Sequence, residues 1–185
     1  VEKLAAKPLV KGIRRTIQSR DAGFAMQPDF LAGVRMLSEF DLSFDICIKH
    51  QQMGDTLDLV LNCPKTRFVL DHIGKPGIKD GLLDPWREQI TTLAGFPNVQ
   101  CKLSGMVTEA DLANWTPEQL RPYIDHIIGA FGVERVMFGS DWPVQARAAT
   151  YPQWIEVLQD ALKDFSDDEK DAIFYRNGAA FYAIA

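Results

Sequence analysis

Two short apolar runs of this sequence end abruptly in side chains that can take part in hydrolysis. The run Phe68–Asp71 leads directly into His72, and the run Val136–Phe138 leads through a glycine and a serine to Asp141. In a parallel α/β barrel, the side chains that do chemistry lie at the carboxyl ends of the strands. An imidazole and a carboxylate placed there can hold a metal ion or activate a water molecule. We therefore predict that His72 and Asp141 form the catalytic pair of one site.

Purely structural interpretations of these and neighbouring residues remain open. Asp141 could cap the helix after its strand, and His72 could be a hydrogen-bonded core residue. His126 is expected on a helix surface, whereas His50 directly follows a strand and could lie at the rim of a pocket. Because side chains alternate along a strand, Asp71 is expected to point away from His72, toward the helices, and to cap the following turn.

Four further residues are predicted to bind substrate: Arg14, Lys102, Ser104 and Trp142. Alternation allows only one of Arg14 and Arg15 to point inward, where a guanidinium could clamp a carboxylate or a hydroxyl group. Lys102 lies within a strand, so it faces either the polar upper layer of a barrel or solvent between helices. Ser104 could instead simply end its strand, and Trp142 could pack against a helix as other tryptophans do.

Strand-like and helix-like patterns alternate along the whole chain. The apolar runs predict five strands, at 10–14, 42–48, 67–71, 99–103 and 135–138. Helical spacing of apolar residues and capping patterns predict helices at 28–40, 54–61, 85–93, 117–131 and 152–162, and a last one that begins after Ser166. Strands alternating with helices indicate right-handed βαβ units and a parallel sheet. We predict an α/β fold and a single domain over residues 1–185.

Composition limits the partners that we expect. The 185 residues carry a formal net charge of −5 and no basic stripe, which argues against binding to nucleic acid or to a membrane surface. Apolar runs are much shorter than the roughly 18 residues of a membrane-spanning helix. Cys47, Cys63 and Cys101 form no CxxC pair, so we interpret them as reduced core thiols of a cytoplasmic protein.

Five motifs resemble a known family. They are Gly12–Arg14, Leu42–Asp45, Val69–Pro76, Cys101–Gly105 and Met137–Pro143. In this order they resemble the amidohydrolase-type lactonases, TIM-barrel hydrolases that open sugar lactones such as fucono- or rhamnono-lactone, or pyrone dicarboxylate lactones. The segments 107–111 and 121–123 look most like the sugar-lactone branch. The resemblance implies a parallel (β/α)8 barrel of which this chain holds only about the last five βα units.

The resemblance also implies a mechanism and a cofactor. A small-molecule lactone would be attacked by water whose proton Asp141 accepts, and His72 and Asp141 would be ligands of one divalent metal ion, with zinc as the first choice. The family carries His-x-His on its first strand, and this chain has no such pair. We therefore expect a C-terminal portion of a longer parent that is inactive alone. Its exposed barrel edges could pair with a second copy to form a homo-oligomer.

Two other functions stay open beside the lactonase. A related decarboxylase or amide hydrolase of the same superfamily would use a similar set of histidine and aspartate residues. A non-catalytic truncated fragment would fold without chemistry.

Overall fold

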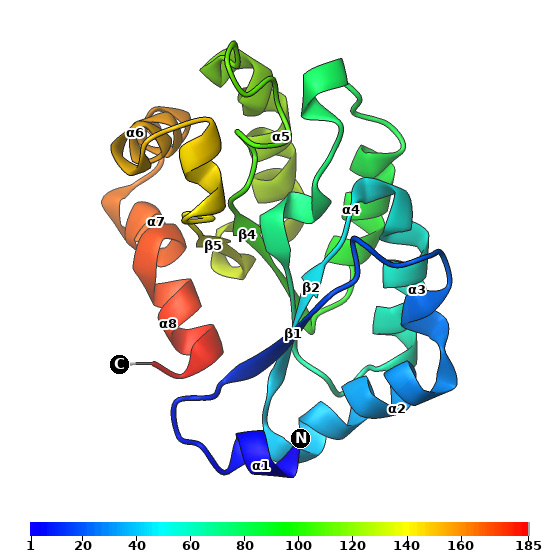
Figure 1. Cartoon of the computed structure of the whole chain (residues 1–185). Coiled ribbons are helices and arrows are strands. Elements are labelled where there is room, and N and C mark those ends of the chain that lie inside the picture. Colours follow the sequence, from blue (N-terminus) through cyan, green and yellow to red (C-terminus); the bar gives the residue numbers. More distant parts are fainter. Residues whose placement is uncertain (185) are drawn as a thin grey trace.

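Five parallel strands form a single sheet in the computed structural model, which describes residues 1–184 (Figure 1). Neighbouring strands of the sheet are also consecutive in the chain, in the order β1-β2-β3-β4-β5. Their bounds are Gly12–Thr16 for β1, Ser43–Cys47 for β2, Phe68–Leu70 for β3, Val99–Leu103 for β4 and Val136–Phe138 for β5. Each step therefore places the next strand beside the last, as in the wall of a barrel.

The five predicted strands are confirmed, with two differences that matter for the site. Strand β1 starts and ends two residues later than predicted, because its parallel pairing with β2 continues to Thr16, opposite Cys47. Arg14 consequently lies in the middle of the strand rather than at its end. Strand β3 ends at Leu70, so Asp71 opens the following turn, and the left-handed backbone of the next residue, His72, ends the strand alternation after Asp71.

Helices follow every strand. Their bounds are Glu2–Ala5 for α1, Pro28–Leu37 for α2, Met53–Asn62 for α3, Trp86–Ala94 for α4, Pro117–Phe131 for α5, Tyr151–Ala161 for α6, Asp167–Asp171 for α7 and Asn177–Tyr182 for α8. The segment predicted at 28–40 is α2 followed by one 3-10 turn. Helices α5 and α7 begin as predicted after Thr116 and Ser166, and each of these two residues forms a capping box. A π-helical segment, Ala172–Arg176, joins α7 to α8.

Alternation along the strands gives the sheet an apolar face and a polar face. Side chains such as Phe44, Leu70 and Val136 belong to the main core, into which the helices also pack. Helices α3 and α4 contact each other, as do α4 and α5, and α5 and α6, so they follow one another around the sheet (Figure 1). Burial of this apolar face supplies the main driving force for folding.

The opposite face carries Arg14, Asp45 and Lys102, and the end of the chain covers part of it. In α8, the Tyr182 hydroxyl donates to Asp45 Oδ2 at 2.7 Å, and its ring lies 5.1 Å from Lys102 Nζ. Phe181 packs in a small second cluster with residues of β3 and β5. A charged layer therefore lies inside the curve of the sheet, below the strand ends.

Helices in the described part of the chain are all too short or too polar to cross a membrane.

Candidate active site

A cavity of about 250 Å³ lies at the carboxyl ends of the strands. All five strands, or the loops directly after them, contribute to its wall. The wall includes Arg14 and Thr16 from β1, Cys47 from β2, His72 and Lys75 after β3, Thr108 and Glu109 after β4, and Asp141, Val144 and Arg147 after β5. This is the end of a parallel barrel sheet at which enzymes place their chemistry.

The structure brings His72 and Asp141 together in this cavity. His72 Nε2 lies 3.5 Å from Asp141 Oδ1, and both side chains are about nine-tenths buried, with exposures of 10% and 11%. Their positions follow β3 and β5, which are separated in the sheet by β4. A base and an imidazole from different strands can therefore act on one bound molecule.

Both residues have a left-handed backbone. The φ angles are 55° for His72, 49° for Ile73, 50° for Lys75 and 59° for Asp141. This conformation is rare for residues other than glycine, and especially so for a β-branched residue. Strained backbone of this kind concentrates at functional sites, where surrounding contacts maintain it. Here Trp86 Nε1 donates a hydrogen bond of 2.8 Å to the Ile73 carbonyl and so anchors the turn.

Ser104 positions the imidazole of His72. Its Oγ lies 2.9 Å from His72 Nδ1, and Ser104 is only 1% exposed. Ser104 was predicted to bind substrate, but it lies behind His72 rather than on the cavity wall. Burial lowers the pKa of His72, although the nearby carboxylate of Asp141 acts in the opposite direction. The imidazole is therefore held neutral, with Nε2 left to face the cavity.

Asp71 points into the barrel and not toward the helices, so that prediction is wrong. It accepts hydrogen bonds from Arg14 Nη1 at 3.3 Å and from Lys102 Nζ at 2.9 Å, and it is 2% exposed. The reason is that Asp71 keeps the alternation of β3 and lies on the same inner face as Val69, whereas the left-handed backbone of His72 breaks the alternation and lets the imidazole reach the cavity as well. Arg15 points to the other side of the sheet, where it lies over the ring of Phe24.

Lys102 lies one layer below the cavity and not on its wall. Its ammonium group also donates to Asp45 Oδ2 at 2.8 Å. Burial lowers the pKa of Lys102, but the charges of Asp71 and Asp45 outweigh this effect and raise the pKa above its ordinary value. Lys102 is therefore a permanent cation that fixes the position of Asp71. Of the two predicted basic residues, Arg14 is the one with access to the cavity, because its side chain is 53% exposed.

Trp142 and two histidines lie outside the cavity wall. Trp142 is 74% exposed on the surface, and its backbone N–H donates to Ser140 Oγ. His126 bonds to the carbonyl of Arg87 and is exposed, as expected. His50 is bound through Nδ1 to the carbonyl of Lys75 at 2.9 Å, so it supports the strained turn from outside.

Sequence reasoning missed several residues of the wall. Lys75 and Glu109 form an ion pair of 3.8 Å on the cavity wall, which Arg147, from the loop after β5, also lines. Burial raises the pKa of Glu109, against the opposing effect of Lys75. Lys75 follows His72 closely within one motif, and Glu109 lies in a segment that resembled sugar lactonases, so both carried a usable signal.

Comparison with known proteins identifies the family. The model of the Amidohydrolase family (Amidohydro_2) matches residues 1–184. The chain belongs to the amidohydrolase family. It is 32% identical over 191 residues to an L-fucono-1,5-lactonase from Burkholderia ambifaria, and covers 65% of that protein. It is 27% identical over 203 residues to an L-rhamnono-gamma-lactonase from Scheffersomyces stipitis, and covers 60% of it. Each of these matches spans at least 95% of the present chain.

A solved structure agrees with the fold. The crystal structure of an amidohydrolase from Burkholderia multivorans with bound zinc superposes with a TM-score of 0.91 at 33% identity, covering 95% of this chain and 65% of that one. The chain thus spans between about half and two thirds of the length of its curated relatives. The five-stranded parallel sheet and the resemblance to amidohydrolase-type lactonases are both confirmed by these matches.

The spacing of His72 and Asp141 suits a metal ion. Two ligand atoms bound to tetrahedral zinc at about 2.0–2.2 Å stand roughly 3.4 Å apart. The observed separation of Nε2 and Oδ1 is 3.5 Å, which is longer than a strong hydrogen bond. The Nδ1 atom is already engaged by Ser104, as the second nitrogen of a metal-bound histidine usually is by some partner. The residues present therefore fit a divalent cation.

Proposed function

We propose that this chain supplies the C-terminal five βα units of an amidohydrolase barrel that hydrolyses a sugar lactone. The observation that carries the proposal is the paired His72 and Asp141 in a cavity at the carboxyl ends of five parallel strands. Similarity to fucono- and rhamnono-lactonases supports the choice of substrate class.

The lining of the cavity favours a hydroxylated substrate. Val144 is the one aliphatic side chain among the residues that line it, and the others carry hydroxyl, thiol, amide, imidazole or charged groups. Carboxylates such as Glu109 accept hydrogen bonds from sugar hydroxyls, and Arg14 and Arg147 donate to ring and carbonyl oxygens. An aromatic or aliphatic ligand would leave these polar groups without partners, which is costly in a closed site.

In the proposed reaction, Asp141 is the general base. Its carboxylate accepts a proton from a water molecule as the water oxygen attacks the lactone carbonyl carbon. The developing oxyanion is stabilised by the positive charges that line the cavity, at Lys75 and Arg14. Asp141, now protonated, returns the proton to the ring oxygen as the bond between that oxygen and the carbonyl carbon breaks. The products are one hydroxyl group and one carboxylic acid, which releases its proton to solvent and becomes a carboxylate.

His72 has a supporting role that its surroundings define. Ser104 holds Nδ1, so Nε2 is directed at the cavity beside Asp141. His72 and Asp141 are also the residues that would hold a divalent ion, for which zinc is our first choice. Such an ion, when bound, would supply Lewis-acid polarisation of the carbonyl.

Lactone opening can be tested directly. The rate of acid release should be measured for the chain alone and for the chain co-expressed with the N-terminal part of the Burkholderia ambifaria lactonase that it does not match. We expect hydrolysis of L-fucono-1,5-lactone and related sugar lactones in the combined sample, and little by the chain alone. An acidic aromatic substrate and a simple amide serve as controls. Faster decarboxylation or amide cleavage than lactone opening would overturn the proposal in favour of a related amidohydrolase activity.

A further inference from the structure

Helix α8 ends against the charged layer on the inner face of the sheet. Arg67 Nη1 donates a hydrogen bond of 2.6 Å to the carbonyl of Phe181, and the Arg67 guanidinium lies 5.4 Å from the centre of the Phe181 ring. The ring of Tyr182 packs against that of Phe181 at 4.9 Å, and its hydroxyl reaches Asp45. These contacts fix Tyr182 in place, and the proposed reaction uses neither Tyr182 nor Asp45.

Asp45 depends on Tyr182 for part of its hydrogen bonding. Its Oδ2 accepts from the Tyr182 hydroxyl at 2.7 Å and from Lys102 Nζ at 2.8 Å, whereas its buried Oδ1 has no hydrogen-bond partner among residues 1–184. Burial and the charge of Asp45 raise the pKa of Tyr182, so the hydroxyl keeps its proton and remains a donor. A buried acceptor without a partner is costly, so without this hydroxyl Asp45 would attract Lys102 more strongly.

Lys102 is shared between two carboxylates. Its ammonium group also donates to Asp71 Oδ1 at 2.9 Å, and the other oxygen of Asp71 accepts from Arg14 Nη1 at 3.3 Å. Arg14 lines the cavity. A shift of Lys102 toward Asp45 leaves Asp71 less neutralised, and Asp71 then holds Arg14 more tightly. A shift of Lys102 toward Asp71 has the opposite effect and releases Arg14.

We propose that Tyr182 is a positioning residue for substrate binding, because it sets how freely Arg14 reaches a ligand in the cavity. The influence passes along the hydrogen bonds of Asp45, Lys102 and Asp71, in that order. This inference rests on the proposed function, in which Arg14 donates to the lactone. The end of the chain thus acts on the site from below, without touching the substrate.

Phenylglyoxal modifies accessible guanidinium groups and therefore measures the freedom of Arg14 in the 185-residue chain itself. Mass spectrometry of peptide fragments separates Arg14 from the neighbouring Arg15. The variant Tyr182→Phe keeps the ring and removes only the hydroxyl, and it should slow the modification of Arg14 at least about twofold, the lower end of coupling within one hydrogen-bond network. The variant Asp45→Asn should speed it at least about twofold, because Lys102 then neutralises Asp71 alone.

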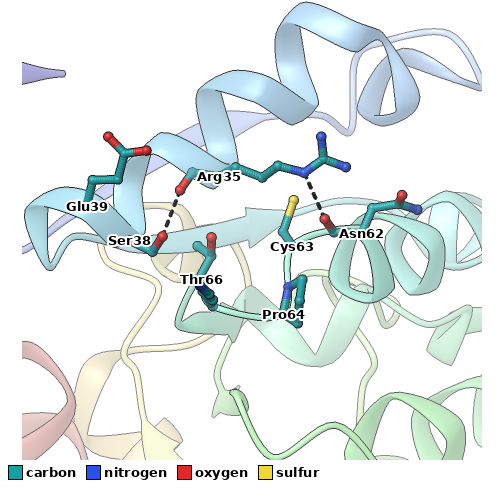
Figure 2. Close-up of a pocket in the computed structure, with 8 residues that line it drawn as sticks. Arg35, Ser38, Glu39, Asn62, Cys63, Pro64 and Thr66 are labelled. Carbon is teal, nitrogen blue, oxygen red and sulfur yellow. Dashed lines mark hydrogen bonds between the residues drawn. The ribbon is translucent and has the colours of Figure 1, made fainter.

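Two controls separate this effect from a general loss of structure. Tyr175 is 60% exposed on the segment before α8, so Tyr175→Phe should leave the Arg14 rate unchanged. Arg35 lines a separate pocket of about 330 Å³, where Figure 2 shows its Nε bonded to the carbonyl of Asn62. None of the described residues of the charged layer lines that pocket, so the Arg35 rate should be the same in every variant.

Activity provides the second measurement. In the combined sample that tests the proposed function, kcat/KM for L-fucono-1,5-lactone should fall in Tyr182→Phe and stay unchanged in Tyr175→Phe. An Arg14 rate that Tyr182→Phe does not change, or a slower rate without a fall in kcat/KM, would overturn the inference and leave lactone hydrolysis standing. Shifts of the same sign in Tyr182→Phe and Asp45→Asn would also overturn it. If the combined sample hydrolyses no lactone, the proposed function fails, whereas the opposite shifts of the Arg14 rate still support the coupling of Tyr182 to Arg14.

Discussion

Two glycines offer a sharp test of how His72 is held. Gly105 follows Ser104 and has a φ of +63°, and a Cβ atom added there would lie 2.8 Å from the Cβ, Cγ and Nδ1 atoms of His72. Gly81 has nearly the same φ, +66°, but a Cβ added there would meet nothing within 4 Å. The substitutions Gly105→Ala and Gly81→Ala therefore share the backbone penalty and differ in the contact with His72.

The expected magnitudes follow from these two contributions. A left-handed conformation costs an alanine about 1–2 kcal/mol, and this applies to both variants. Gly105→Ala adds the cost of overpacking, about 1–3 kcal/mol, because the nearest atoms belong to the root and ring of a buried side chain that cannot easily move. We expect Gly105→Ala to lower the free energy of unfolding by about 1–3 kcal/mol more than Gly81→Ala does.

Urea denaturation of both variants measures this difference, and the imidazole NMR signals of His72 report any displacement of the ring. We expect those signals to shift in Gly105→Ala and to stay in place in Gly81→Ala. Equal loss of stability in the two variants, with unchanged His72 signals, would refute the argument that the chain at Gly105 holds the imidazole in place.

Three further predictions concern the charged layer, the base and the sheet edges. The free energy of unfolding should fall as the pH rises above about 10.4, because the unfolded chain releases the lysine proton there while folded Lys102, whose pKa is raised, retains it. In Lys102→Met this part of the pH dependence should disappear. An unchanged pH dependence would contradict the role of Lys102 as a fixed cation. In the chain co-expressed with the N-terminal part of the barrel, Asp141→Asn should lower kcat for lactone opening at least about 100-fold. Stability should change little, since asparagine tolerates the left-handed backbone well. Turnover within a few-fold of the parent would make Asp141 a structural residue. The mass of the chain in solution, measured by light scattering, should be that of a dimer or a larger oligomer, because β1 and β5 each have one edge without a partner strand among residues 1–184. A strictly monomeric mass would argue against pairing through those edges.

The sequence by itself determined the strands, most helices and the ends of the sheet at which the chemistry lies. Apolar runs bounded by polar residues identified β4 without error, and capping boxes marked the starts of α5 and α7. Strand alternation was enough to separate Arg14 from Arg15. These features are local, because hydrophobic periodicity and helix capping depend on residues only a few positions apart.

Tertiary structure decided which side chains meet. Asp71 shares the inner side of the sheet with its neighbour His72 because four consecutive residues, His72 to Lys75, adopt positive φ, which alternation cannot predict. Its partners Arg14 and Lys102 lie 57 and 31 residues away in the chain. Ser104 likewise reaches His72 from a different strand. Such contacts depend on the register between strands and on the conformation of the turns that follow them, and neither is fixed by the residues of one segment alone.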